Sequence, residues 1–367
     1  MRIAVLIGTR PEAIKMAPVV SALRRQPGNE VFLCASGQHG EMLDIVLADF
    51  GLKPDARLPA PPTAPDLSLL TSHLLQGISP WLEGLAPDWL LIQGDTTTVM
   101  ASALAASHRK IKIGHVEAGL RSFNKHSPWP EEMNRKLTTA LADVHFAPTE
   151  TARQNLVNEG VPPGLIHVTG NTVVDALQHI RERITERPET LPEPVRAEKA
   201  QGRRLVLVTC HRRENFGEPL KRICGAVAEL AVKYRDCSFV WPVHKNPNVE
   251  NVVTGFFQGV PNVILLPPLS YESLLGVLMR SSLALSDSGG LQEEAPSFQV
   301  PVLVLRDTTE RPEGLAAGAA RLVGANEALI VQAASAILDQ SGPWTPINNP
   351  YGDGHASTRI AHILSEC

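Results

Sequence analysis

The stretch that decides the fold of this chain is residues 283–296, LALSDSGGLQEEAP. Its first three residues are typical of a buried strand, and the serines and glycines after them allow a close approach of the backbone before a helix begins. Backbone N–H groups at such a turn, together with the positive end of the helix dipole, hold phosphate groups. Ser288, Gly289 and Gly290 therefore predict a diphosphate site, although glycine pairs also mark ordinary surface turns.

Two charged residues near this turn indicate what else the ligand carries. The carboxylate of Glu294 lies about one turn into the predicted helix, where it would repel phosphate but could bind the vicinal hydroxyls of a ribose. Arg311 follows the next predicted strand and could supply a fixed positive charge. Together with the glycine turn, these residues favour a nucleotide diphosphate over a plain surface turn.

Length and composition indicate a globular chain of two domains. The 367 residues exceed one typical core, and a net charge of −4 points to neither nucleic acid nor an anionic membrane as partner. The apolar run at 3–7 is too short for a signal sequence or a spanning helix, so we expect a cytoplasmic protein. The five cysteines are scattered and include no Cys-x-x-Cys pair, which argues against disulfides and against zinc.

Alternating strand and helix patterns predict an α/β fold with two parallel sheets. We expect the first domain to span 1–168 and the second to follow from 169. The proline-rich segment 54–65 is expected to be a loop, and the charged segment 187–204 an irregular connection.

Polar side chains follow the carboxyl ends of predicted strands in the first half. Arg10 and Lys15 follow the first strand, and Asp95 and Glu117 follow two later ones. Open α/β sheets bind their ligands at this edge, so these residues are candidate ligand contacts. The alternatives are solvated surface charges for Arg10 and Lys15, and a helix cap for Asp95.

A third carboxylate, Glu131, opens a helix after Pro128-Trp129-Pro130. The helix dipole alone would favour an acid there. It does not explain why Asp95, Glu117 and Glu131 should all be expected at one rim, where grouped carboxylates can divide acid and base roles. Arg135, one turn further on, could pair with Glu131 or reach the pocket.

In the second half, a predicted strand at 204–209 delivers Cys210-His211-Arg212-Arg213-Glu214. A histidine among arginines suits a hydrogen bond to phosphate or donation of a proton to a leaving group. A metal pair of His211 and Glu214 lacks a third ligand at a recognisable spacing, so no metal is expected. The turn after the first strand lacks G-x-G-x-x-G, so no bound dinucleotide is indicated.

Seven motifs in chain order resemble those of the non-hydrolysing UDP-N-acetylglucosamine 2-epimerases. They are GTRPEAIK at 8–15, GDTTT at 94–98, HVEAGLR at 115–121, PEE at 130–132, HRRE at 211–214, SDSGGLQEEAP at 286–296 and RDTTERPE at 306–313. The resemblance covers essentially the whole chain, including NPYGDG at 349–354. It implies the glycosyltransferase-B type fold, with two Rossmann-like domains facing a cleft.

The resemblance further implies that the second domain spans 169–354 and that a helix over 355–367 packs back on the first domain. It implies a cytoplasmic homodimer that needs no cofactor and converts UDP-N-acetylglucosamine (UDP-GlcNAc) to UDP-N-acetylmannosamine (UDP-ManNAc) for envelope polysaccharide biosynthesis. Asp95, Glu117 and Glu131 are similar to the acids proposed for the chemistry. By the resemblance, the family's ligand-contacting positions in the cleft are Arg10, Lys15, Asp95, Glu117 and His211 in this chain. Its diphosphate loop matches Ser288, Gly289 and Gly290. Its ribose contact matches Glu294, and Arg311 matches a further contact.

At the uracil pocket the family often carries Gln and Phe where this chain has Leu269 and Leu274. A backbone contact at Leu269 would survive that change, whereas Leu274 offers apolar cover without an aromatic face.

Family chemistry implies anti elimination. UDP leaves C1 while a base takes the C2 proton, and UDP adds back to the 2-acetamidoglucal after protonation of its opposite face. Three other interpretations stay open: a glycosyltransferase of the same fold, a regulator that binds nucleotide sugars, and an epimerase of a related UDP-diacetamido sugar.

Overall fold

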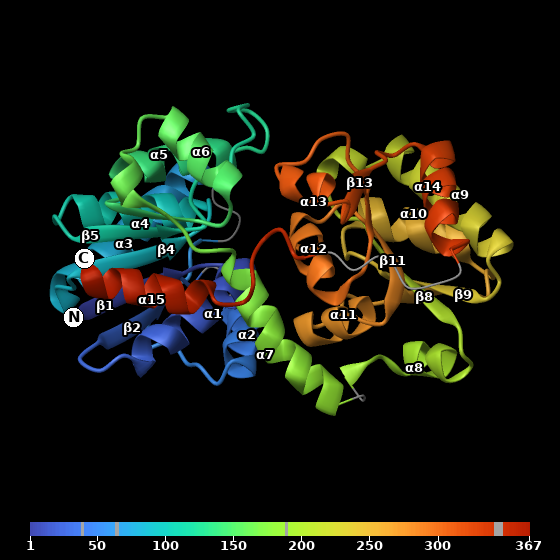
Figure 1. Ribbon diagram of the computed structural model, residues 1–367, viewed down its shortest axis with the longest axis horizontal. Coiled ribbons are helices and arrows are strands. Elements are labelled where there is room, and N and C mark those ends of the chain that lie inside the picture. The colour runs from blue at the N-terminus through green and yellow to red at the C-terminus, as the bar shows by residue number, and fades with distance from the viewer. Residues whose placement is uncertain (38–39, 63–65, 188–189, 341–347) are drawn as a thin grey trace. The chain divides into compact units, whose positions relative to one another are not determined.

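The computed structural model describes residues 1–37, 40–62, 66–187, 190–340 and 348–367, and for 40–42 it describes the backbone alone. The chain forms two compact units. The first consists of Met1–His179 with Tyr351–Cys367, and the second of Ile180–Pro350. Each unit is built on its own parallel sheet with helices on both faces (Figure 1). The fold is therefore α/β, as the sequence predicts.

The first unit contains a parallel sheet whose central strands are almost completely buried, as strands covered on both faces must be. Its strands are β1 (Arg2–Ile7), β2 (Glu30–Ala35), β3 (Ala56–Arg57), β4 (Trp89–Gln93), β5 (Lys112–Val116), β6 (Val144–Ala147) and β7 (Ile166–Val168). They lie in the order β3-β2-β1-β4-β5-β6-β7. The order changes direction between β1 and β4, which is where such sheets bind ligands.

Helices cover both faces of this sheet, and most of them begin a few residues after a strand end. They are α1 (Arg10–Arg25), α2 (Gly40–Asp49), α3 (Leu67–Leu85), α4 (Thr97–Ser107), α5 (Glu131–Leu141), α6 (Glu150–Asn158), α7 (Thr172–Glu186) and α15 (Ala356–Glu366). Pro11 stands in the first turn of α1, where its missing N–H costs nothing.

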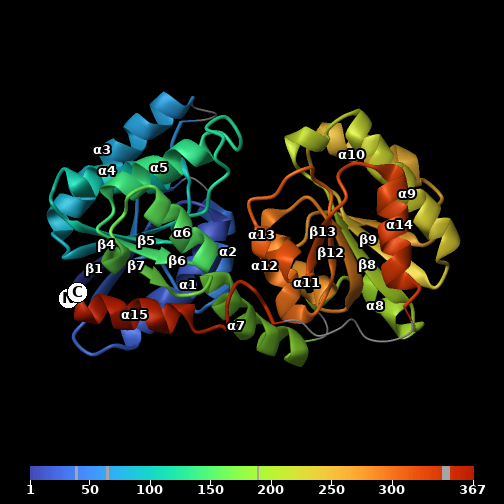
Figure 2. The ribbon, with the colours of Figure 1, turned by 45° about the horizontal axis from the view of Figure 1, so that its top comes forward.

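The last helix returns to the first unit. In both ribbon views α15 lies beside α1, and the two helices are in contact (Figure 2). The buried carboxylate of Asp175 accepts the backbone N–H groups of Ala356 at 3.2 Å and of Ser357 at 2.8 Å. These are N–H groups at the start of α15, which have no partner within the helix. Asp175 therefore fixes the point at which the returning chain becomes helical.

The second unit repeats the plan with the strand order β10-β9-β8-β11-β12-β13, all parallel. Its strands are β8 (Arg204–Thr209), β9 (Cys237–Pro242), β10 (Val263–Leu266), β11 (Ser281–Ser286), β12 (Val302–Val304) and β13 (Ala320–Leu322). Its helices are α8 (Glu193–Ala200), α9 (Glu218–Lys233), α10 (Pro247–Phe257), α11 (Tyr271–Leu278), α12 (Gly289–Glu294), α13 (Pro312–Ala316) and α14 (Glu327–Leu338). Here the order changes direction between β8 and β11, so the segments after these two strands are neighbours.

The structure differs from expectation in three places. The segment 54–65 contains the short strand β3, which pairs with Cys34 and Ala35; residues 63–65 lie outside the described part. The segment 187–204 contains helix α8, because its prolines stand at the start of that helix, where proline is tolerated. The division of the chain falls at 179 and 350, whereas the expected boundaries are 168 and 354.

Candidate functional site

Glu117 lies in a turn directly after β5, with a left-handed backbone at φ +62°. Its side chain is buried and makes an ion pair with the buried ammonium group of Lys15 from α1. Gln93, the last residue of β4, donates a hydrogen bond to Oε2 of Glu117, and Asn171 donates to Oε1 at 3.4 Å. Two predicted site residues are thus brought together, and the carboxylate of Glu117 is held on several sides.

Asp95 follows β4 and is held by the first turns of α5. Its Oδ2 accepts from Nε of Arg135 at 2.9 Å and lies 2.7 Å from Nη2, so two guanidinium nitrogens share one carboxylate oxygen. Asn134 donates to the backbone oxygen of Asp95 at 2.9 Å. The turn that carries Asp95 also approaches Glu117, since a Cβ on Gly94 would lie 3.7 Å from Oε2 of Glu117. Asp95, Glu117 and Arg135 therefore come from adjoining turns at one edge of the sheet.

Arg135 pairs with the neighbouring acid Glu132 and not with Glu131. The Nη1 of Arg135 donates to Oε2 of Glu132 at 2.9 Å. Glu132 also accepts the backbone N–H groups of Ser122 at 3.0 Å and Phe123 at 3.1 Å. Pairing with Glu131, one of the two possibilities that the sequence leaves open for Arg135, is therefore wrong, and its partners are Glu132 and Asp95.

Glu131, the first residue of α5, is in a different electrostatic position from the other two acids. Its Oε2 is buried and has no hydrogen-bond partner in the part of the chain that the structure describes. Asp95 faces an arginine and Glu117 faces a lysine. Within the described ranges, Asp95 and Glu117 therefore each have a basic partner, whereas Oε2 of Glu131 has no hydrogen-bond partner.

The turn after β1 brings Arg10 to the same edge of the sheet. A buried carboxylate supports this turn: Glu12 accepts the N–H of Gly8 at 2.6 Å and the hydroxyl of Thr9 at 3.1 Å. Burial raises the pKa of Glu12 to about 7, although these hydrogen bonds oppose the shift. Arg10 is half-buried, and its side chain makes no ion pair within the described ranges. Its charge is available to an anion.

In the second unit, His211 and the Ser288 turn follow the neighbouring strands β8 and β11. The Nδ1 of His211 lies 3.1 Å from Oδ1 of Asp287, the residue before Ser288. The imidazole is about 40% exposed, whereas the Asp287 side chain is completely buried. The predicted histidine and the predicted glycine turn are thus adjacent, and the buried carboxylate connects them.

Arg311 supports the glycine turn from behind. A Cβ on Gly289 would lie 2.6 Å from Nη1 of Arg311, so only glycine allows the guanidinium to pack there. Arg311 is also paired with Glu293 at 2.8 Å and with Glu310 at 2.6 Å. Burial would raise the pKa of Glu310, but the charges of Arg311 and Arg306 outweigh it and lower that pKa well below its usual range. The charge of Arg311 is therefore shared with carboxylates.

The remaining predicted contacts surround the start of α11. Glu294, at the end of α12, accepts a hydrogen bond from the hydroxyl of Tyr271 at 2.8 Å. Leu269 and Leu274 are half-buried on either side of that tyrosine in the sequence. All the predicted residues of the second unit therefore belong to segments near the carboxyl ends of its strands.

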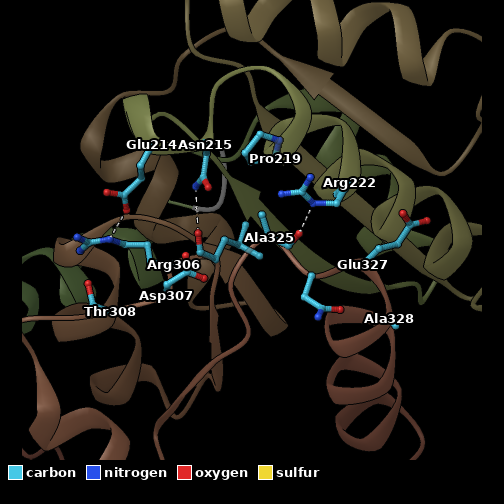
Figure 3. Close-up of a pocket in the computed structure, with 12 residues that line it drawn as sticks. Glu214, Asn215, Pro219, Arg222, Arg306, Asp307, Thr308, Ala325, Glu327 and Ala328 are labelled. Atoms are coloured by element: carbon cyan, nitrogen blue, oxygen red, sulfur yellow. Dashed lines mark hydrogen bonds and ion pairs between the residues drawn. The ribbon is translucent and has the colours of Figure 1, made fainter.

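A polar pocket of about 620 Å³ that the sequence does not predict lies next to the His211 loop (Figure 3). Inside it, Arg306 donates to Glu214 at 2.6 Å, Asn215 donates to the backbone oxygen of Leu305 at 3.0 Å, and Arg222 donates to that of Ala325 at 2.9 Å. Its other lining residues are Pro219, Asp307, Thr308, Asn326, Glu327 and Ala328.

No group of three or more His, Cys, Asp or Glu side chains that could hold a metal ion is present in the described ranges. Nor does any helix within them combine the length and the apolar character needed to cross a bilayer.

Comparison with known proteins decides the family. Residues 21–365 match the model of the UDP-N-acetylglucosamine 2-epimerase family. The chain belongs to this family. It is 46% identical to the UDP-N-acetylglucosamine 2-epimerase of Yersinia pestis and 45% identical to that of Escherichia coli K12, in each case over 99% of this chain and 98% of the relative.

Solved structures of 2-epimerases agree with the fold. The UDP-GlcNAc 2-epimerase of Neisseria meningitidis bound to UDP-GlcNAc superposes with a TM-score of 0.93, is 42% identical, and covers 100% of both chains. The two α/β units of this 2-epimerase family member are thus of the glycosyltransferase-B type.

Sequence reasoning missed several residues that hold the predicted ones in place. Gln93, Glu132, Asn171 and Asp287 all contact candidate site residues, and Tyr271 contacts Glu294. Each of these residues lies in or near a motif or a strand end, and this position was the one sign in the sequence that it could belong to the site. Apart from Glu132, which lies three residues before Arg135, these residues have partners that are distant in the chain, so spacing alone could not assign them.

Proposed function

We propose that this protein is a non-hydrolysing 2-epimerase that interconverts UDP-GlcNAc and UDP-ManNAc. The observation that carries the proposal is the family membership of the whole chain, together with the ligand of its Neisseria relative, UDP-GlcNAc. The proposal is supported by the presence of the motif residues to which it gives roles, most of which follow strands of the two sheets, with Glu131 at the start of α5.

In this proposal the second unit binds the nucleotide. Ser288, Gly289 and Gly290 approach the diphosphate with their backbone N–H groups. Arg311 packs against Gly289 and leaves no room for a side chain at this position. Glu294 accepts the ribose hydroxyls, with its carboxylate oriented by Tyr271. His211 donates a hydrogen bond to the departing diphosphate, whose negative charge grows as the C1–O bond breaks.

The first unit supplies the acid–base groups. Inversion at C2 needs one group that removes the C2 proton and one that returns a proton to the opposite face. We assign proton exchange to Glu131, whose Oε2 has no partner within the described ranges. Glu117 and Asp95, held by Lys15 and Arg135, orient the sugar and complete the acid–base set. Arg10 adds positive charge for the leaving diphosphate.

The steps balance without an external oxidant or reductant. The C2–H bonding electrons form the C1–C2 double bond as the C1–O electrons leave with UDP. Return of a proton to C2 from the other face, with attack of UDP on C1, gives the epimer. We extend the proposal to a cytoplasmic homodimer that serves envelope polysaccharide biosynthesis and uses no cofactor.

The direct test is incubation of the purified protein with UDP-GlcNAc alone, followed by proton NMR of the sugar. We expect the anomeric signal of UDP-ManNAc to grow to a constant ratio with UDP-GlcNAc, and Glu131→Gln to abolish this growth. If the sugar stays unchanged until an acceptor is added and is then transferred, the protein is a glycosyltransferase. Binding without any conversion would identify a regulator, and conversion of only a UDP-diacetamido sugar would reassign the substrate.

A further inference from the structure

We propose that Asp287 is a positioning residue that fixes the ring of His211 with Nδ1 protonated and Nε2 directed away from the protein. The inference rests on the proposed function, because it concerns the histidine that meets the leaving diphosphate. Nothing in the sequence pattern distinguishes Asp287 from the serines and glycines beside it.

Asp287 collects an unusual number of donors from the segment after β8. Its carboxylate accepts the N–H of His211 at 2.9 Å, the N–H of Arg212 at 2.9 Å and the side-chain amide of Asn215 at 3.0 Å. The thiol of Cys210 lies 3.2 Å from Oδ2. Because the side chain is completely buried, each of these bonds replaces one that water would otherwise make.

The same carboxylate holds the ring of His211. Nδ1 lies 3.1 Å from Oδ1, and an ionised carboxylate can only accept, so Nδ1 must carry a proton. Burial would raise the pKa of Asp287, but the hydrogen bond and charge of His211, with the N–H of Arg212 and the amide of Asn215, lower it to about 2. The carboxylate is therefore ionised throughout the neutral range.

This arrangement leaves one ring nitrogen for chemistry. With Nδ1 bound to Asp287, Nε2 accepts when the ring is neutral and donates when the ring is an imidazolium. A departing diphosphate needs a donor, and a charged donor stabilises it most. A buried carboxylate that orients a histidine in this way also stabilises the imidazolium form, as in hydrolase triads.

Asp287 further connects three loops of the second unit. It immediately precedes Ser288 in the diphosphate turn, and it holds the loop after β8 through His211 and Arg212. Asn215, which donates to Asp287, also donates to the backbone oxygen of Leu305 after β12, a bond drawn in Figure 3. The position of His211 relative to the diphosphate turn is therefore set by one carboxylate.

The substitution Asp287→Asn makes a specific prediction. Three donors converge on Oδ2, so the single amide oxygen should occupy that position and the NH₂ group should face His211. Nδ1 then has to accept, and the proton of the neutral ring moves to Nε2. The variant ring can still donate from Nε2, but only as a neutral group, because the negative charge of Asp287 beside it is gone. We expect kcat for UDP-GlcNAc to fall by roughly 100-fold, with KM changed by less than about 5-fold, since a neutral donor stabilises the leaving diphosphate less than a charged one does.

The experiment is ¹⁵N NMR of the full chain labelled at histidine, with His211 assigned by the signal that His211→Gln removes. In the UDP-bound wild type we expect a protonated Nδ1, and in Asp287→Asn a ring protonated at Nε2 alone. The matched control is Asp175→Asn, which removes another buried carboxylate that accepts backbone N–H groups. It should lower stability but leave kcat and the His211 signal unchanged.

A neutral wild-type ring protonated at Nε2 would overturn the proposal, even if Asp287→Asn does not fold. An Asp287→Asn variant with wild-type kcat would also overturn it. Failure of the wild type to epimerise UDP-GlcNAc would instead overturn the proposed function, and the NMR result would still decide how Asp287 holds His211.

Discussion

The buried ammonium group of Lys15 donates a hydrogen bond to the buried carboxylate of Glu117. The two residues lie 102 positions apart in the sequence and meet at the carboxyl edge of the first sheet. A buried ion pair contributes little net stability, but removal of one charge from it is costly. Glu117 is thus both a candidate acid–base group and a part of the fold, whereas Glu131 has no comparable partner within the described ranges.

Glu117→Gln should lower kcat at least 100-fold while leaving the affinity for UDP unchanged, because the proposed nucleotide contacts belong to the second unit. It should also destabilise the protein by about 3 kcal/mol, since the charge opposite Lys15 is removed from a buried site. Kinetics, calorimetric titration with UDP and urea unfolding measure the three quantities. Adding Lys15→Met should restore part of the stability without restoring turnover, and retained turnover in Glu117→Gln would exclude it from the acid–base set.

Glu131→Gln, in contrast to Glu117→Gln, should lose turnover without losing stability. We expect turnover to fall at least 100-fold, with a change in unfolding free energy below about 0.5 kcal/mol. The reason is that the buried Oε2 of Glu131 makes no hydrogen bond within the described ranges, so an amide there breaks none. Urea unfolding and epimerisation kinetics on the same preparation test the contrast with Glu117→Gln. A large loss of stability would show that Glu131 serves the fold.

Gly289→Ala should weaken the binding of UDP by about 10-fold or more. The added methyl group would lie 2.6 Å from Nη1 of Arg311, so the guanidinium or the diphosphate turn must move. The matched control is Gly255→Ala in α10, where no atom lies within 4 Å of the added group. Gly255→Ala should bind UDP as the wild type does and be slightly more stable. Equal affinities in both variants would argue against the diphosphate site.

Glu12 should give stability a pH dependence of its own. Its pKa is about 7 in the folded protein and near 4.5 ordinarily, so the folded state binds more protons between these values. The contribution of Glu12 to the free energy of unfolding therefore falls as pH rises from about 4.5 to about 7, by about 3 kcal/mol at most. Above about pH 7 this contribution no longer changes with pH.

The unfolding free energy of wild type minus that of Glu12→Gln, measured from pH 4.5 to 8, isolates this contribution. Buried histidines such as His115, whose pKa burial lowers to about 3, act in the opposite direction but cancel in the difference. A difference that does not change with pH would show that Glu12 is ionised in the fold.

Much of this arrangement follows from local sequence. Buried strands ending in Asp95 and Glu117, and a strand entering the Ser288 turn, can be read from apolar runs and the polar residues after them. The sequence does not show which strand ends are neighbours in the sheet. Asp287 and His211 lie 76 residues apart and meet because β8 and β11 pair in the sheet. Helix α8 was missed because prolines at 192 and 194 resemble a break, although the first turn of a helix accepts them.

The most direct test of the central claim is epimerisation of UDP-GlcNAc in heavy water with no acceptor present. If UDP leaves as the C2 proton is removed and a solvent-derived proton returns, deuterium should appear at C2 of both UDP-GlcNAc and UDP-ManNAc, as measured by NMR and mass spectrometry. Epimers that interconvert with the original hydrogen retained at C2, or transfer of the sugar to an added acceptor without label in either epimer, would contradict the account.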